Sequence, residues 1–308
     1  MKNVQEIAEG LMPIPADVPA DKIADFRSNF EHATAKTGRL MLFAGDQKLE
    51  HLNRDFSGEG ISADDANPVH LFQIASQATI GVFATQMGLI SRYAGQFPDI
   101  PFLVKLNSKT NLVPFEQNDP VSRAWFSVEQ VVEFSKSAKL NILGVGYTVY
   151  LGSDYEAKML KEAAEIVHKA HLNGLITVLW MYPKGKAVKD EHDVQVVAGA
   201  AGAGACLGAD FVKLKVPMQD KKADPELMKP VVAAAGNTGV LCEGGSREDP
   251  RVFLSELHDL IHKGGTRGSG TGRNIHQRDL SSAIKMANAI HAITVEEKTA
   301  EEATRLLQ

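Results

Sequence analysis

Cysteine is scarce in this sequence of 308 residues and occurs only at Cys206 and Cys242. Two cysteines cannot build a disulfide framework, and their scarcity is typical of chains that fold in a reducing compartment. The chain also lacks an excess of basic residues, with 33 Lys and Arg against 38 Asp and Glu and a formal net charge of −5. We therefore expect neither nucleic acid nor an anionic membrane as a partner, although a local phosphate site stays open.

Long apolar runs are lacking as well. The uncharged apolar stretch at 174–183 is much shorter than the roughly 20 residues that a membrane-spanning helix needs. Residues 1–6 have no apolar core of a signal peptide and already include an acidic residue. Because 44% of the residues are hydrophobic and 23% are charged, the composition is that of a globular protein, and we expect it in the cytoplasm.

Short apolar segments alternate along the chain with longer helical patterns. Each segment is bounded by Gly, Pro, Asn or Asp, as expected for parallel strands buried on both faces. Helix-start signals lie between them, such as the capping box that begins at Ser127 and the Asp249-Pro250 pair. The alternation predicts an α/β fold, a single (β/α)₈ TIM barrel over residues 37–308 with an N-terminal helical extension over 1–36. The eight expected strands are 40–45, 79–85, 102–107, 141–148, 175–181, 211–216, 240–243 and 266–271.

Two lysines stand on the sixth expected strand. Lys213 and Lys215 are two residues apart, so both side chains point to the same side, while the apolar residues between and beside them face the helices. This alternation predicts two amines inside the barrel mouth. Burial and a second cation each lower the pKa of a lysine, which produces the free amine that Schiff-base chemistry requires. A purely structural alternative is that both lysines pair with carboxylates such as Asp46 or Glu243.

Glycine-rich turns follow the seventh and eighth strands, the usual position of a phosphate site in such barrels. They contain Gly244, Gly245 and Ser246 in one turn, and Gly272 with Arg273 in the other. Glycines let backbone N–H groups approach an anion, and an arginine adds a forked donor. The alternative is that these are only tight turns between strand and helix.

The remaining candidates are aromatic residues and histidines. Trp180 and Tyr182 alternate at the end of the fifth strand, where a tyrosine can transfer a proton or both can simply form part of an aromatic rim. The histidines show no convergent ligand pattern, since only His51 and His192 lie near strand ends. We expect no metal and no organic cofactor.

Several segments, in this order, carry a resemblance that spans roughly 40–290. They are Lys105–Asn107, Leu143–Ser153, Trp180–Gly185, Gly208–Lys215, Gly272–Ile275 and the Gln277-Arg278 pair. Together they resemble the class I (Schiff-base) aldolases of archaeal type, relatives of deoxyribose-phosphate aldolase. The best-known members of that family are fructose-1,6-bisphosphate aldolases.

The resemblance implies a role for each matching residue. Lys213 corresponds to the Schiff-base lysine, Tyr182 to the main proton-transfer group and Asp46 to a residue that orients hydroxyls or accepts a proton. Trp180 completes the aromatic pair, and Lys215 would lower the pKa of Lys213 and hold charge near the phosphate. The implied contacts to substrate and phosphate are Gly244, Gly245, Ser246, Gly272, Arg273, Lys184 and Lys105.

This chain departs from the family pattern at two positions. Both departures bear on which substrate is bound, and neither changes the Schiff-base lysine. Many relatives have His-Gly after the first-strand aspartate, whereas this chain has Gln47-Lys48 after Asp46. Glu243 also stands where a small residue is common. The turn beyond Asp46 must therefore differ from that of the relatives.

The expected activity is reversible cleavage of fructose 1,6-bisphosphate to dihydroxyacetone phosphate and glyceraldehyde 3-phosphate. One alternative is a related synthase on another keto-phosphate, such as a dideoxy-heptulosonate synthase. Others are a phosphosugar isomerase without covalent chemistry and a non-catalytic protein that binds sugar phosphates. The resemblance further implies a homo-oligomer whose only other partner is the phosphorylated sugar.

Overall fold

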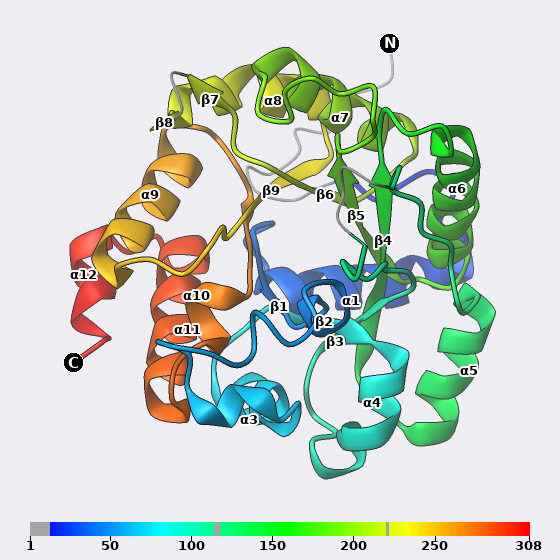
Figure 1. The fold of residues 1–308 in the computed structure, drawn as a ribbon. Helices are drawn as coiled ribbons and strands as arrows, with labels where there is room; N and C mark the ends of the chain where they lie inside the picture. Colours follow the sequence, from blue (N-terminus) through cyan, green and yellow to red (C-terminus); the bar gives the residue numbers. More distant parts are fainter. Residues whose placement is uncertain (1–12, 114–117, 220–221) are drawn as a thin grey trace.

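A computed structural model describes residues 13–113, 118–219 and 222–308. Eight parallel strands close into a barrel in the order β1-β10-β9-β6-β5-β4-β3-β2 (Figure 1). All eight expected strands are confirmed, and the TIM-barrel prediction with them. The strands are β1 (Leu40–Ala44), β2 (Val82–Gln86), β3 (Phe102–Lys105), β4 (Ile142–Tyr150), β5 (Ile176–Tyr182), β6 (Phe211–Leu214), β9 (Gly239–Glu243) and β10 (Gly268–Thr271).

Helices form a ring around the barrel (Figure 1). The long ones are α3 (Val69–Gln77), α4 (Met87–Tyr93), α5 (Val128–Ala138), α6 (Glu156–Leu172), α7 (Val194–Cys206), α8 (Met228–Ala235), α9 (Pro250–His262) and α11 (Leu280–Val295). Three short ones are α2 (Gln47–Glu50), α10 (Arg273–His276) and α12 (Ala300–Arg305). The 3-10 turns are η1 (Ala20–Lys22), η2 (Ala63–Ala66), η3 (Ala94–Gln96) and η5 (Pro225–Leu227). Within the part of the chain that the structure describes, no helix is both long and apolar enough to span a membrane.

The helix starts follow the sequence signals. Ser127 accepts a hydrogen bond from the backbone N–H of Gln130, whose side chain accepts one from the N–H of Ser127, a complete capping box. Asp249 caps α9 ahead of Pro250. These caps fix where each helix begins on the barrel.

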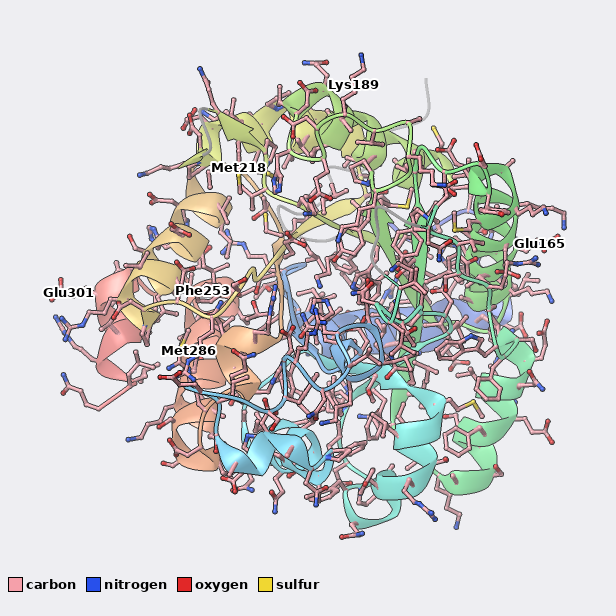
Figure 2. The ribbon with its side chains drawn as sticks, viewed as in Figure 1. Glu165, Lys189, Met218, Phe253, Met286 and Glu301 are labelled. Carbon is pink, nitrogen blue, oxygen red and sulfur yellow. The ribbon has the colours of Figure 1, made fainter. Side chains whose placement is uncertain are left out.

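The core lies between the strands and the helix ring. Nearly all strand residues are buried, because one face of the barrel packs inward and the other against helices. In Figure 2, Phe253 and Met286 lie within the helix layer, whereas Glu165, Lys189 and Glu301 lie at its rim. This separation follows the apolar stripes of the helices.

The N-terminal segment contributes a helix, α1 (Ile23–Thr34), which packs against β1, β4 and β5. Its buried Phe30 stacks on Phe211 at the start of β6, and Phe26 meets His171 edge-on. The helix therefore lies at the N-terminal end of the barrel, away from the strand ends where working residues gather. The expected helix in this segment is confirmed. Residues 1–12 lie outside the part of the chain that the structure describes. A domain boundary at residue 36 stays a prediction.

One element was not predicted. A two-stranded antiparallel hairpin, β7 (Met218–Gln219) and β8 (Lys222–Ala223), follows β6. The apolar pattern through Val216 predicted a longer sixth strand, but pairing with β5 ends at Lys213 and pairing with β9 ends at Leu214.

Candidate active site

A polar cavity opens at the C-terminal ends of five strands. Ten of the twelve residues singled out from the sequence line it, so the structure brings these ten together. Ser246 and Lys105 are not among the lining residues. The lining consists of Asp46, Gln47, Glu50, His51, Trp180, Tyr182, Lys184, Lys213, Lys215, Glu243, Gly244, Gly245, Gly270, Gly272 and Arg273.

Lys213 lies at the centre of this cavity. Strand register places it beside Trp180 of β5, and its Nζ lies 5.6 Å from the centroid of that ring. On the other side, Gly270 leaves room for the lysine, since a Cβ there would come within 2.6 Å of Cε. Burial lowers the pKa of Lys213, and the positive charge of Lys105 lowers it further, whereas the carboxylates of Asp46 and Glu243 act in the opposite direction. The net effect favours the neutral, nucleophilic amine.

Lys215 also faces the cavity, as the strand alternation predicts. Its Nζ lies 2.5 Å from Oε1 of Glu191, a residue of the loop between β5 and α7. The sequence-based expectation was that Lys215 depresses the pKa of Lys213. In the structure the positive charge of Lys105 lowers the pKa of Lys213, whereas the charge of Lys215 is paired with that of Glu191.

Lys105 occupies a different place from the one expected. Its side chain is fully buried at the end of β3, and Nζ donates to Oγ1 of Thr148 at 2.6 Å and to the carbonyl oxygen of Asn107 at 3.1 Å. The same amine lies 3.5 Å from Oδ2 of Asp46 and 4.6 Å from the centroid of the Trp180 ring. Lys105 lies outside the cavity lining, where Asp46 and Thr148 hold its amine, so its expected contact with substrate or phosphate stays a prediction.

Asp46 follows β1, and a side chain at the end of β2 holds its backbone. The side-chain amide of Gln86 donates to its backbone carbonyl at 2.8 Å. While Oδ2 faces Lys105, the buried Oδ1 has no hydrogen-bond partner among the described residues. A buried carboxylate oxygen without a partner is costly.

Tyr182 ends β5 and is 7% exposed. Burial raises its pKa well above the usual value, and the carboxylates of Glu243, Glu50 and Asp46 raise it further. The phenol therefore keeps its proton at neutral pH and acts as a donor. Lys184 lies over its ring, with Nζ 5.4 Å from the centroid.

One side chain, that of Asn274, joins the two glycine-rich turns. Nδ2 of Asn274 donates to the carbonyl oxygens of Gly244 at 2.7 Å and of Ser246 at 2.9 Å. Nε of Arg273 donates to the carbonyl oxygen of Gly245 at 3.1 Å. These contacts hold the turns after β9 and β10 together.

Carboxylates of the lining complete the site. Glu50 accepts a hydrogen bond from the hydroxyl of Tyr150 at 3.3 Å, and Glu243 ends β9 beside Gly270. Glu50 was not singled out from the sequence, although its position shortly after a strand end was a usable signal. Among residues 13–113, 118–219 and 222–308, no group of three or more His, Cys, Asp and Glu side chains is arranged to hold a metal ion.

The chain is similar to proteins of known family over most of its length. The profile of the DeoC/LacD family aldolases matches residues 40–278. A protein of Methanocaldococcus jannaschii, the fructose-bisphosphate aldolase/6-deoxy-5-ketofructose 1-phosphate synthase, is 53% identical over 293 residues, which cover 95% of this chain and 93% of that protein.

Two solved structures support the same family assignment. A fructose-bisphosphate aldolase from Slackia heliotrinireducens superposes with a TM-score of 0.94 at 50% identity, covering 98% of this chain and 95% of that one. An archaeal fructose-1,6-bisphosphate aldolase, with its catalytic lysine covalently bound to the carbinolamine intermediate, superposes with a TM-score of 0.74 at 31% identity. The superposition covers 88% of this chain and 99% of the archaeal one. The resemblance drawn from the sequence is confirmed.

Proposed function

The chain belongs to the DeoC/LacD family of aldolases, and from this premise we propose that it cleaves fructose 1,6-bisphosphate reversibly through a Schiff base on Lys213. The observation that carries the proposal is the buried amine of Lys213 between Trp180 and Gly270, facing a cavity with phosphate-binding turns. The products are dihydroxyacetone phosphate and glyceraldehyde 3-phosphate. No cofactor enters this scheme, because the iminium on the lysine is the electron sink.

The first half of the reaction joins the lysine to the ketose. The neutral amine of Lys213 attacks the C2 carbonyl, and the carbinolamine then loses its hydroxyl as water. We assign the proton for that departure to Tyr182, whose phenol is protonated at neutral pH and lines the cavity beside Lys213. The product is an iminium between C2 and Nζ.

Bond cleavage then requires a base at the C4 hydroxyl. We assign this role to Asp46, whose Oδ1 has no partner among the described residues. As the proton leaves, C4–O becomes a carbonyl, the C3–C4 bond breaks, and its electron pair forms the enamine and neutralises the nitrogen. After glyceraldehyde 3-phosphate leaves, the proton held by Asp46 is transferred to C3 of the enamine. Water then hydrolyses the resulting iminium, which releases dihydroxyacetone phosphate, regenerates the neutral lysine and returns a proton to Tyr182.

The phosphates have two groups of partners. The turns at Gly244–Ser246 and Gly272–Arg273 suit one phosphate, since they combine backbone N–H donors with a guanidinium. Lys184 lies on the opposite side of the cavity, at the end of β5, and suits the second.

A second candidate uses the same enamine with a different aldehyde. It is supported by the 53% identical relative, whose name includes 6-deoxy-5-ketofructose 1-phosphate synthase. A synthase of this kind transfers the three-carbon enamine to an aldehyde other than glyceraldehyde 3-phosphate. Substrate profiling with several aldehydes separates the two activities.

Borohydride trapping tests the covalent mechanism. Incubation with fructose 1,6-bisphosphate or dihydroxyacetone phosphate, followed by reduction and peptide mass mapping, is expected to place a stable adduct on Lys213. Lys189→Ala is a matched control, because this exposed lysine lies at the rim of the molecule (Figure 2). An isomerase or a non-catalytic binding protein would give no adduct.

We further propose that the protein is a cytoplasmic homo-oligomer. The support is the sequence composition and the family resemblance. Light scattering of the purified protein tests the oligomeric state, and a monomer at micromolar concentration would contradict it.

A further inference from the structure

Glu50 lines the cavity from the end of α2, one helical turn beyond Asp46. Residues four apart lie on the same face of a helix, and their side chains lean toward its N-terminus. The carboxylate of Glu50 therefore lies on the same side of α2 as that of Asp46. The backbone carbonyl of Glu50 accepts a hydrogen bond from the N–H of Asn111 at 3.1 Å, which fixes this end of the helix.

A buried tyrosine holds one of the two carboxylate oxygens of Glu50. Tyr150 ends β4 and is fully buried, and its hydroxyl donates to Oε1 of Glu50 at 3.3 Å. Burial raises the pKa of Tyr150 well above its usual value, and the carboxylate of Glu50 raises it further, so the phenol keeps its proton as a donor. Among the residues that the structure describes, the Glu50 carboxylate makes no other hydrogen bond and no ion pair. One oxygen of this partly exposed side chain therefore remains for a molecule in the cavity.

The order of the strands indicates which half of a ketose meets Glu50. The turns proposed for one phosphate follow β9 and β10, whereas Tyr150 ends β4, which stands four strands from β10 in either direction around the barrel. A ketose with that phosphate at the turns and with C2 on Lys213 therefore extends toward the ends of β4 and β5. The carbons beyond C3 lie there. With the C4 hydroxyl at Asp46, the next hydroxyl of the ketose, on C5, falls to Glu50.

The chemistry of a carboxylate determines what this position of the cavity accepts. An ionised carboxylate accepts hydrogen bonds and donates none. It therefore suits a hydroxyl group, which donates. A carbonyl at the same carbon would bring a second acceptor against it, and a methylene would leave the carboxylate oxygen unpaired. Because C5 of the ketose is C2 of the aldehyde product, the selection applies to the aldehyde.

We propose that Glu50 is a specificity-determining residue that accepts a hydrogen bond from the C5 hydroxyl of the ketose, and that Tyr150 is its positioning residue. The aldehyde class selected is a 2-hydroxyaldehyde rather than a 2-deoxy or 2-oxo aldehyde. This inference rests on the proposed function, because it assigns Glu50 to the aldehyde half of that same site. It also gives the two carboxylates of α2 separate tasks, since Asp46 removes a proton and Glu50 only binds one hydroxyl.

Condensation with two matched aldehydes tests the role of Glu50. Dihydroxyacetone phosphate is combined with D-glyceraldehyde 3-phosphate or with 3-oxopropyl phosphate, which lacks only the 2-hydroxyl, and kcat/KM is measured for each aldehyde. Both aldehydes react with the same enamine on Lys213, so a change in the reactivity of the lysine cancels in the ratio of the two constants. In Glu50→Met this ratio is expected to fall about tenfold to hundredfold, the range for loss of a hydrogen bond to a charged group. Glu50→Gln, which keeps an acceptor oxygen, is expected to lose less. Glu59→Met, at an exposed glutamate in the loop after α2, is the matched control and is expected to keep the ratio.

A double-mutant cycle tests the positioning by Tyr150. Tyr150→Phe removes the hydroxyl that holds Glu50, so it is expected to lower the same ratio but to add nothing when Glu50 is already replaced by Met. Glu50→Gln supplies the other arm of the cycle if Glu50→Met does not fold. An unchanged ratio in the Glu50 variants, or additive losses in the cycle, would overturn the inference. Absence of both a reduced adduct and any condensation in the unaltered protein would instead overturn the proposed function, so the two failures are distinguishable.

Discussion

Lys105 and Asp46 form a buried ion pair, with Nζ 3.5 Å from Oδ2 and side chains that are 0% and 5% exposed. The pair joins the ends of β3 and β1 on the side of the cavity that faces Lys213. Asp46 raises the pKa of Lys213 and Lys105 lowers it. The ion pair therefore affects the fraction of Lys213 that is present as the neutral amine. A buried pair of this kind is expensive to desolvate, which is consistent with a role in the reaction rather than in stability.

Replacing Lys105 by Met is therefore expected to move the pH optimum upward. Removing the cation raises the pKa of Lys213, and an amine with a raised pKa becomes neutral only at higher pH. The initial rate of imine formation, measured by borohydride trapping from pH 6 to pH 10, checks this. Lys136→Met, on α5, is a control for loss of a lysine, and an unshifted profile in Lys105→Met would contradict the assigned influence.

We expect the replacement of Lys213 and the replacement of Lys215 to have different effects on the reaction. Lys213→Ala abolishes both turnover and the trapped adduct, because the nucleophile is lost. Lys215→Ala keeps an adduct and leaves the pH optimum nearly unchanged, since Glu191 neutralises Lys215. Peptide mass mapping of the adduct decides the assignment, and an adduct on Lys215 would show that the wrong lysine was chosen.

Tyr182→Phe removes the proposed proton donor but keeps the ring. We expect kcat to fall about 10²–10⁴-fold, the range for loss of a general acid or base. We also expect the thermal midpoint to stay close to that of the unaltered protein. Because the pKa of Tyr182 lies well above its usual value, this phenol causes no loss of activity between pH 7 and pH 9. A kcat within threefold of the original would exclude Tyr182 from proton transfer.

Arg273→Ala is expected to weaken binding of phosphorylated substrates at least tenfold. A hydrogen bond to a charged group contributes about 1.5–3 kcal/mol, and the side chain also donates to Gly245 in the facing turn. The Michaelis constant for fructose 1,6-bisphosphate checks this. An unchanged constant would show that the turn after β10 is only structural.

The sequence predicted the barrel and the convergence of the site because both follow from short-range rules. Apolar runs of strand length gave eight strands, and residue alternation on β6 gave the direction of Lys213 and Lys215. The rule that working residues lie at C-terminal strand ends then brought together residues 46, 182 and 273, which are far apart in the chain.

What escaped prediction depends on loop paths. Glu191 reaches Lys215 from a loop, and Asp65 reaches His276 across 211 residues of sequence. Neither pairing leaves a periodic signal. Lys105 was expected to contact substrate or phosphate, and its side chain turns toward Thr148 and Asp46, a direction that one-residue alternation cannot specify.

The last prediction concerns His171, which ties the N-terminal segment to the barrel. Its buried ring lies between two carboxylates, with Nδ1 2.7 Å from Oδ1 of Asp17 and Nε2 3.3 Å from Oδ2 of Asp210. Burial lowers the pKa of His171, but the contacts with Asp210 and Asp17 outweigh it, so that the net pKa is raised above 6.5. A histidine whose pKa is higher in the folded protein than in the unfolded protein stabilises the fold. This contribution is complete at pH values below the unfolded-state pKa, and it is lost as the pH rises through the folded-state pKa. The thermal midpoint is therefore expected to decrease from pH 6 to pH 9.

In Asp17→Asn this decrease is expected to become smaller, because one of the two carboxylates that favour the charged ring is gone. Asp21→Asn, at an exposed position in the same segment, is expected to keep the original slope. Equal slopes in all three proteins would show that the His171–Asp17 contact contributes nothing to stability.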